Sequence, residues 1–272
     1  KQKTAYEIRL SLVGSEMCIR DSIMVGFVVA VSLNRRVGWN DAAFGALVAA
    51  FPNTGFMGVP LLVALLGPAA AGPAIVTIMI DMVLTTSLCI ALSRLDGADQ
   101  HGVAQAARNA LRGVLVNPLP WAILLGALVS ALELQLPGPA LQTLGLLADA
   151  ASPVALFTIG AVLARSQMRV ASDGAPELPL RDYVPVAFIK LLLHPVLVLL
   201  VGGAAIQLGV PLDRFALTVM VLVAALPSAS NVSLLAEKFG ADSGRIARII
   251  LVSTAVSFLS FSAAVSMLTG NP

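Results

Sequence analysis

The chain has 272 residues, of which 58% are hydrophobic and only 12% are charged, whereas about a quarter of the residues are charged in an ordinary soluble domain. This composition indicates an integral membrane protein and excludes a soluble globular domain. The net charge of +2 is small, and we expect no nucleic-acid partner.

Residues 1–22, KQKTAYEIRLSLVGSEMCIRDS, are polar and change abruptly to the apolar run IMVGFVVAVSL at residue 23. They lack the basic start, apolar centre and small-residue cleavage site of a signal peptide. The string resembles a translated sequencing-adapter read. We therefore expect residues 1–22 to be either a non-native artefact or a tail that lies outside the fold.

The rest of the chain is organised as a series of apolar stretches. They cover residues 23–33, 41–66, 69–92, 114–134, 145–164, 183–209, 213–238 and 243–269. All but the first reach the roughly 20 residues that a helix needs to cross the hydrocarbon core. The sequence thus predicts eight membrane segments, of which the first is too short.

The positive charges indicate the orientation of these segments. Most Lys and Arg residues beyond residue 22 fall in four alternate loops, near residues 35–36, 94–112, 165–181 and 238–248. Cytoplasmic loops carry an excess of Lys and Arg. We therefore expect these four loops in the cytoplasm of a bacterium, with the protein in its cytoplasmic membrane.

Two similar phrases interrupt the apolar stretches, AAFPNTGFMGVPLL at 49–62 and AALPSASNVSLLAEKFG at 224–240. Each places proline and an asparagine where a membrane helix would otherwise be continuous. Open backbone at that depth is tolerated only where protein buries it or where it lines a cavity. A matched pair of interruptions in two halves of a chain points to the binding site of a transporter.

In the first phrase, the candidate binding residues are Asn53, Gly55, Gly58 and Pro60. Proline lacks an amide hydrogen and clashes with the carbonyl four residues back, here that of Phe56, while glycines permit a non-helical turn. We expect the helix to open between 53 and 60, so that its amide ends and the Asn53 side chain could hold a carboxylate. The alternative is a proline kink that only aids packing.

In the second phrase, Pro227 supplies the break, and the candidate polar lining is Ser228, Ser230 and Asn231. Serine in membrane helices often bonds to the carbonyl of its own helix or packs helices closely. We therefore rank Asn231 above Ser228 and Ser230, with Ser233 lowest.

Three ionisable side chains lie inside apolar segments, where a charge is by default a functional candidate. They are Asp81, Lys190 and His194, and the last two are four residues apart, hence on one helix face. Lys190 could pair with Asp81 or neutralise an anion, and His194 could take part in proton coupling. The alternatives are a structural ion pair, or a lysine that extends toward the cytoplasmic surface.

The positions of the two phrases also give the length of an internal repeat. The segment 114–134 opens the second half, and Pro227 follows about 113 residues later, which places the start of the first half about 60 residues before residue 1. Two helices would then be missing from ten, arranged as two inverted sets of five. Asn117 and Pro118 would open one supporting helix, and Pro153 would break the start of the next, after Asp149.

Several segments together resemble the auxin efflux carrier family of permeases, including its malonate-transporter-like members. They are FPNTGFMGVPLL, LVNPLPWAILLG, AASPVALFTIGAVLA, AFIKLLLHP and ALPSASNVSLLAEKFGADSGRIARIILVSTAVSFLS, in that order over residues 23–270. The resemblance implies an all-α polytopic membrane protein with an inverted-repeat transporter fold of five plus five helices. About eight of these would be present here, with two broken crossover helices, in a fold related to plant auxin exporters and bile-acid/sodium symporters.

The resemblance also implies a division into a transport domain and a scaffold domain, in a chain truncated at its N-terminus. The transport domain would comprise residues 23–95 and 183–270, the scaffold helices residues 114–164, and the cytoplasmic loops residues 96–113 and 165–182. A homodimer could form through the scaffold domain.

The implied function is secondary active or facilitated transport of small organic anions, either carboxylates such as malonate or auxin-like weak acids, by alternating access at the crossover. Coupling to protons or to sodium stays open, and neither a cofactor nor a bound metal is expected. One alternative is a sodium-coupled symporter of the bile-acid carrier type. A remote one is an intramembrane enzyme, which the absence of HExxH and GxSxG motifs disfavours.

Overall fold

The computed structural model describes residues 19–32, 37–94, 108, 121–122, 125–126, 128–129, 132, 134–173 and 178–270. Within these residues the backbone is helical apart from short connections and one isolated β-bridge. Most of the expected helix at 114–134, with Asn117 and Pro118, and most of the expected loop at 96–113 lie outside the described residues.

The first half of the described chain contains an unbroken helix, a broken helix and a second unbroken helix. The first covers residues 19–32. The others are built from the following elements: α2 Trp39–Ala50, the π-helix η1 Thr54–Gly58, α3 Val59–Leu66, the 3-10 helix η2 Pro68–Ala70, α4 Ala71–Ile80, the π-helix η3 Asp81–Thr85 and α5 Thr86–Ser93.

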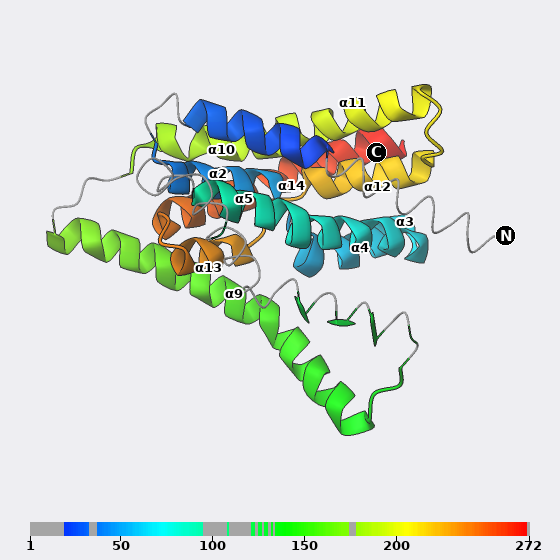
Figure 1. Ribbon diagram of the computed structural model, residues 1–272, viewed down its shortest axis with the longest axis horizontal. Coiled ribbons are helices and arrows are strands. Elements are labelled where there is room, and N and C mark those ends of the chain that lie inside the picture. Colours follow the sequence, from blue (N-terminus) through cyan, green and yellow to red (C-terminus); the bar gives the residue numbers. More distant parts are fainter. Residues whose placement is uncertain are drawn as a thin grey trace.

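The second half repeats this order after the long helix α9 (Gly138–Asp173). An unbroken helix is followed by a broken one and by a second unbroken one (Figure 1). The elements are the 3-10 helix η5 Leu180–Asp182, α10 Val184–Phe188, the π-helix η6 Ile189–Leu193, α11 His194–Gln207, α12 Arg214–Ala225, α13 Asn231–Lys238 and α14 Ser243–Thr269. The repeated plan agrees with the prediction from the twin phrases.

Local sequence accounts for several helix ends. α2 ends at Ala50 because a residue directly before a proline, here Phe51, avoids the helical region. α14 begins with an N-cap, in which the Asp242 side chain accepts a hydrogen bond from the Arg245 amide at 2.9 Å. It ends at Gly270, whose φ of 66° is the left-handed conformation common after a helix.

α9 differs from the sequence prediction. It is helical over 36 residues and contains Pro153 in its interior, although we expected loops at 135–144 and 165–182 and a helix that starts near Pro153. A proline inside a helix removes one hydrogen bond and bends the helix without necessarily ending it. Figure 1 shows such a bend along α9, so Pro153 does not open this helix.

The boundary expected at residue 22 is also wrong for the fold. The helix that contains residue 23 is already formed at residue 19. Arg20 and Asp21 are 1% and 2% exposed, so both side chains belong to the interior. Residues 1–18 lie outside the described residues.

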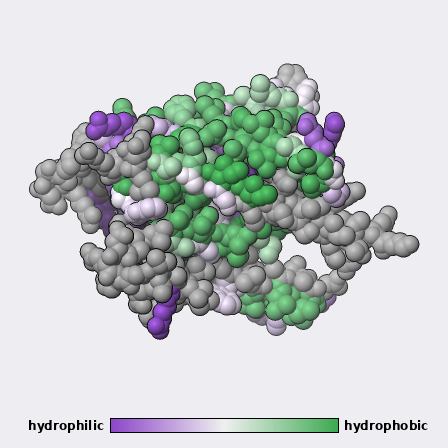
Figure 2. Space-filling view, turned by 45° about the horizontal axis from the view of Figure 1, so that its top comes forward, coloured by the Kyte–Doolittle hydropathy of each residue, from purple (hydrophilic) through white to green (hydrophobic). Residues whose placement is uncertain are grey.

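The described helices have the length and surface of membrane segments. Three of them, Pro68–Ser93, Val184–Gln207 and Ser243–Thr269, are long and apolar enough to cross a bilayer, and Thr54–Leu66 and Arg214–Ala225 are shorter apolar helices. Figure 2 shows hydrophobic residues over the middle of one face, with hydrophilic residues toward its edges. The fold is that of an all-α polytopic membrane protein.

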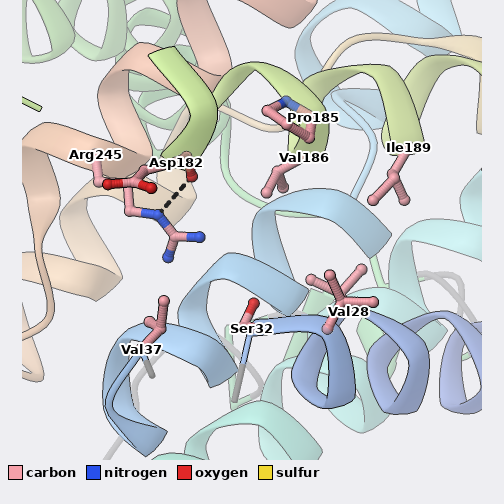
Figure 3. Close-up of a pocket in the computed structure, with 9 residues that line it drawn as sticks. Val28, Ser32, Val37, Asp182, Pro185, Val186, Ile189 and Arg245 are labelled. Carbon is pink, nitrogen blue, oxygen red and sulfur yellow. Dashed lines mark hydrogen bonds between the residues drawn. The ribbon is translucent and has the colours of Figure 1, made fainter. Parts of the chain in front are cut away.

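Arg245 ties three elements together at one end of this bundle. Its Nε donates to the carbonyl of Asp182 and its Nη1 to the carbonyl of Asp41, both at 3.0 Å. A small cavity of about 20 Å³ lies beside it (Figure 3). Gly45 leaves room for the guanidinium, because a Cβ there would lie 3.0 Å from Nη1. Arg245 therefore links the starts of α2, α10 and α14.

We expect Arg245→Lys to destabilise the protein by about 1–3 kcal/mol, because a lysine cannot donate to both carbonyls in the same geometry. The measurement is the thermal unfolding of the purified protein in detergent. The exposed Arg214 serves as the control, and Arg214→Lys is expected to leave the unfolding temperature unchanged. Equal effects of the two substitutions would contradict this role of Arg245.

Candidate substrate site at the helix crossover

The two interrupted helices meet at their breaks. Pro52 and Ser228 form an isolated antiparallel β-bridge. The Asn53 amide donates to the carbonyl of Pro227 at 2.8 Å, and a second backbone hydrogen bond of 2.9 Å runs in the opposite direction. Each break therefore satisfies backbone groups of the other, as buried non-helical backbone requires. The twin phrases form one crossover.

The first helix opens at residues 51–53, earlier than we expected. The chain is helical again from Thr54, as the π-helix η1, and Pro60 lies exposed at the start of α3. Pro60 lies inside the continuous helical segment Thr54–Leu66, directly after the π-helical turn η1, and the helix continues through it. The opening therefore depends on Pro52, and the expectation that Pro60 breaks the helix is wrong.

The two glycines of the first phrase have different roles. Gly55 is exposed, and a Cβ there would meet no atom within 4 Å. Gly58 is buried, and a Cβ there would lie only 2.5 Å from Cδ1 of Leu226, in the break of the other helix. Gly58 thus permits the close approach of the two broken helices.

Polar side-chain atoms without partners lie in the second break and at the start of α13. Ser228 Oγ and Asn231 Oδ1 are buried and have no hydrogen-bond partner among the described residues. The Asn231 Nδ2 group contacts Met82 Sδ at 3.9 Å, and a thioether is a weak acceptor. Buried polar groups are nearly always hydrogen-bonded, so unpartnered ones call for an explanation.

The other polar candidates are placed as follows. Asn53 is partly buried and immediately follows the bridge. Ser230 is buried, and its carbonyl accepts a hydrogen bond of 2.9 Å from the Ser233 hydroxyl. Ser233 thus bonds within its own chain segment, as its low rank anticipated. The structure brings Asn53, Ser228 and Asn231 into the region of the crossover.

Lys190 and His194 lie on one face, as their spacing predicts. The Lys190 Nζ atom is 2.7 Å from His194 Nδ1, and it donates to the carbonyl of Ala224 at 3.0 Å. Both side chains are 0% exposed. Lys190 therefore does not extend to the surface, and the alternative of a lysine reaching the cytoplasmic face is wrong.

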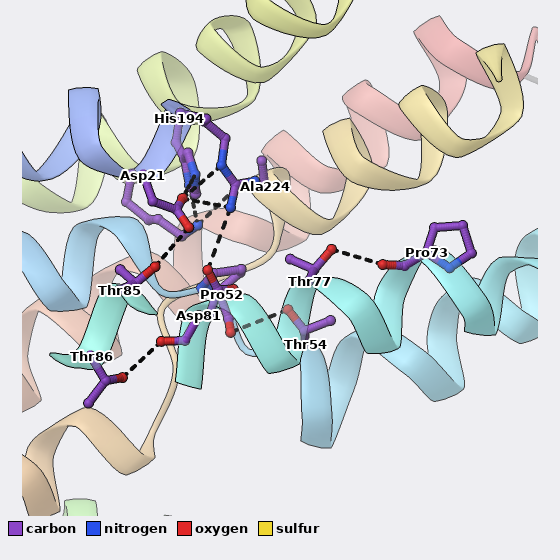
Figure 4. Close-up of polar contacts among 12 residues, drawn as sticks. Asp21, Pro52, Thr54, Pro73, Thr77, Asp81, Thr85, Thr86, His194 and Ala224 are labelled. Carbon is purple, nitrogen blue, oxygen red and sulfur yellow. Dashed lines mark hydrogen bonds and ion pairs between the residues drawn. The ribbon is translucent and has the colours of Figure 1, made fainter. Parts of the chain in front are cut away.

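Asp81 joins the same buried cluster from η3, together with two residues of the helix 19–32 (Figure 4). Arg20 Nη2 lies 2.6 Å from Asp21 Oδ1 and 3.6 Å from Asp81 Oδ1. His194 Nε2 is 3.8 Å from Asp21 Oδ1. Three helices thus bring four charged residues and one histidine together in the protein interior.

The elements that carry these residues share one irregularity. η1 contains Gly58, η3 begins with Asp81, and η6 contains Lys190, and all three are π-helical. Single-turn π segments inside α-helices occur often at functional sites. Four of the sequence candidates, Gly55, Gly58, Asp81 and Lys190, thus lie in such irregular turns.

Sequence reasoning did not select Pro52, Met82, Arg20 or Asp21 as site residues. Pro52 could have been found, because it occupies in AAFPN the place that Pro227 has in AALPS. Met82 and the two charged residues carry no local signal, since only the packing of distant helices brings them to the site. Among the described residues, no group of three His, Cys, Asp or Glu side chains could hold a metal ion.

The chain thus forms a polytopic helical membrane protein with two broken helices that cross in its interior. A family model described as "Membrane transport protein" matches residues 3–265. The chain belongs to this membrane transport protein family, which agrees with the resemblance to auxin efflux carriers.

Individual relatives support the assignment. The chain is 28% identical over 237 residues to a protein of Rhizobium meliloti (strain 1021) named "Putative malonate transporter", with 86% of this chain and 70% of the relative covered. It is 30% identical over 224 residues to "Uncharacterized transporter YfdV" of Escherichia coli (strain K12), covering 81% of this chain and 65% of the relative. An "Uncharacterized transporter" of Methanothermobacter thermautotrophicus is 27% identical, covering 90% and 74%.

We expect Gly58→Ala to destabilise the crossover by about 1–3 kcal/mol, the usual cost of forcing an extra methyl group into a packed interior. Thermal unfolding in detergent measures the effect. Gly55→Ala is the matched control in the same π-helix, and it should cost little because its Cβ meets open space. Gly58→Ala with wild-type stability would show that the two breaks are not in close contact.

Proposed function

We propose that the chain transports small organic anions, carboxylates such as malonate or auxin-like weak acids, by alternating exposure of a site at the crossover. The observation that carries the proposal is a pair of buried polar atoms, Ser228 Oγ and Asn231 Oδ1, that have no hydrogen-bond partner among the described residues. The Ser228 hydroxyl can donate to a carboxylate, and Asn231 Oδ1, an acceptor, can take a hydrogen bond from a protonated acid group. The two atoms thus suit a weak organic acid and its anion.

The N-terminal ends of the two broken helices also favour an anion at the crossover. α13 begins at Asn231 and the segment Thr54–Leu66 begins beside the bridge, so both N-terminal ends face the crossover. N-terminal helix ends carry partial positive charge and unbonded amide hydrogens, which favour anions. The arrangement matches the way in which broken helices bind anionic substrate groups in secondary transporters.

We further propose that the helices form two bodies that move relative to each other. One buried hydrophobic cluster joins the helix 19–32 to α2, α5, α10, α13 and α14, whereas α9 exposes large apolar side chains such as Leu146 and Phe157. We assign the former helices to a transport domain and α9 to a scaffold, through which a homodimer could form. The bacterial cytoplasmic membrane as the location, and proton or sodium coupling, remain predictions.

The name of the Rhizobium relative makes malonate the first substrate to test. We would reconstitute the chain in liposomes and measure counterflow of labelled malonate and of labelled indole-3-acetate, an auxin. The wild type is expected to exchange at least one of these carboxylates. Absence of counterflow for both would contradict the proposed function.

We expect Asn53→Ala and Asn231→Ala to raise the KM for the carboxylate by about tenfold or more, because each removes an amide that can bond to a charged group. Asn40→Ala is the matched control, since the Asn40 side chain donates to the carbonyl of Phe239, outside the crossover, at 3.1 Å. Counterflow by both crossover variants with the wild-type KM would refute a substrate site at this place.

A further inference from the structure

The buried amine of Lys190 lies next to the broken end of α12. Its Nζ donates to the carbonyl of Ala224 at 3.0 Å, and Ala224 lies in the last turn of α12, two residues before the break at Leu226. We propose that Lys190 supplies the positive charge that balances the substrate anion and selects carboxylates over neutral molecules. This inference rests on the proposed function and assigns the charge selectivity of the same site.

The direct hydrogen-bond partners of Lys190 carry no negative charge. Among the described residues, its ammonium contacts the Ala224 carbonyl and the ring nitrogen of His194, and no carboxylate oxygen lies within 4 Å of it. A charge that is removed from water without an opposite charge is costly. A hydrogen bond between two ions is about twice as strong as one between neutral groups, so an entering carboxylate is a better partner than the carbonyl.

The acidic residues of the cluster lie around Arg20. Arg20 lies between the two carboxylates, 2.6 Å from Asp21 Oδ1 and 3.6 Å from Asp81 Oδ1. The Thr85 hydroxyl donates to the second oxygen of Asp21 at 2.8 Å. Both oxygens of Asp81 and both Nη atoms of Arg20 are buried without a hydrogen-bond partner among the described residues. Neither carboxylate is bonded to Lys190, whose Nζ lies at the broken end of α12.

The position of Lys190 also connects its charge to the crossover. The C-terminal ends of helices carry partial negative charge, which would repel an anion. An ammonium on the Ala224 carbonyl neutralises that end of α12, while the N-terminal ends of α13 and η1 are already favourable. With Lys190 in place, three of the four half-helix ends at the crossover carry a field that suits a carboxylate.

A purely structural lysine would behave differently. A cation at the end of a helix stabilises it by about 0.3–1 kcal/mol, and loss of that contact would affect the fold without regard to the charge of the substrate. If Lys190 selects by charge, its removal should raise the KM for anionic substrates. A side chain of another shape that keeps the positive charge should restore part of the affinity. The charge of the competing molecule therefore distinguishes the two roles.

The test uses malonate counterflow by the full chain in liposomes. In the wild type, the neutral analogue malonamide is expected not to inhibit, whereas unlabelled malonate does. Lys190→Gln is expected to raise the KM for malonate by about tenfold or more, and Lys190→Arg to restore part of the affinity because it keeps the charge. Lys238→Gln, at an exposed lysine of α13, is the matched control and should behave as the wild type.

The possible results separate the two claims. Malonate counterflow by the wild type, together with an unchanged KM in Lys190→Gln, would overturn the role of Lys190 and leave the transport function standing. If malonamide inhibited the wild type as strongly as malonate does, the role of Lys190 in charge selection would be overturned, even if Lys190→Gln did not fold. Wild-type protein that exchanges no carboxylate would overturn the proposed function, and this inference with it.

Discussion

The pairing of two helix breaks in the protein interior is the constraint on which the rest of the structure depends. A helix that opens at membrane depth exposes amide and carbonyl groups that no lipid can satisfy. Here the bridge between Pro52 and Ser228 lets each break satisfy the other. Neither break is stable without its partner, so the two halves of the chain must assemble around this point.

The side chains around the crossover follow from that pairing. Gly58 is required because the second break passes directly over it at Leu226. The carbonyl end of α12 is covered by Lys190, whose own position depends on the π-helix η6. Asp81 lies in a second π-helix, beside Arg20 and Asp21. Lys190 and Asp81 thus both lie in π-helical turns. Such irregular turns occur often at functional sites, which agrees with a binding role for these residues.

Sequence reasoning succeeded where the signal was local or repeated. The matched phrases predicted the crossover, and the spacing of Lys190 and His194 predicted their contact. It failed on the exact place of the first opening, because the helix continues through Pro60 after the π-helical turn η1, whereas Pro52 pairs with the other break. The predicted helix was also shorter than α9, because Pro153 bends this helix without ending it. The partners of Asp81 were out of reach, because they come from a segment that the sequence placed outside the fold.

Formation of a disulfide across the bridge tests the pairing of the breaks most directly. Residues opposite each other in an antiparallel pair have Cα atoms about 4.5–5.5 Å apart, within the range of about 4.4–6.8 Å that a disulfide spans. Phe51→Cys with Ala229→Cys, which lie opposite each other beside the bridge and leave both prolines in place, should therefore cross-link under mild oxidation in a chain with Cys18 and Cys89 replaced by serine, as detected by mass spectrometry. Leu65→Cys with Ala229→Cys is the control. Cross-linking no faster than in that control would contradict the crossover.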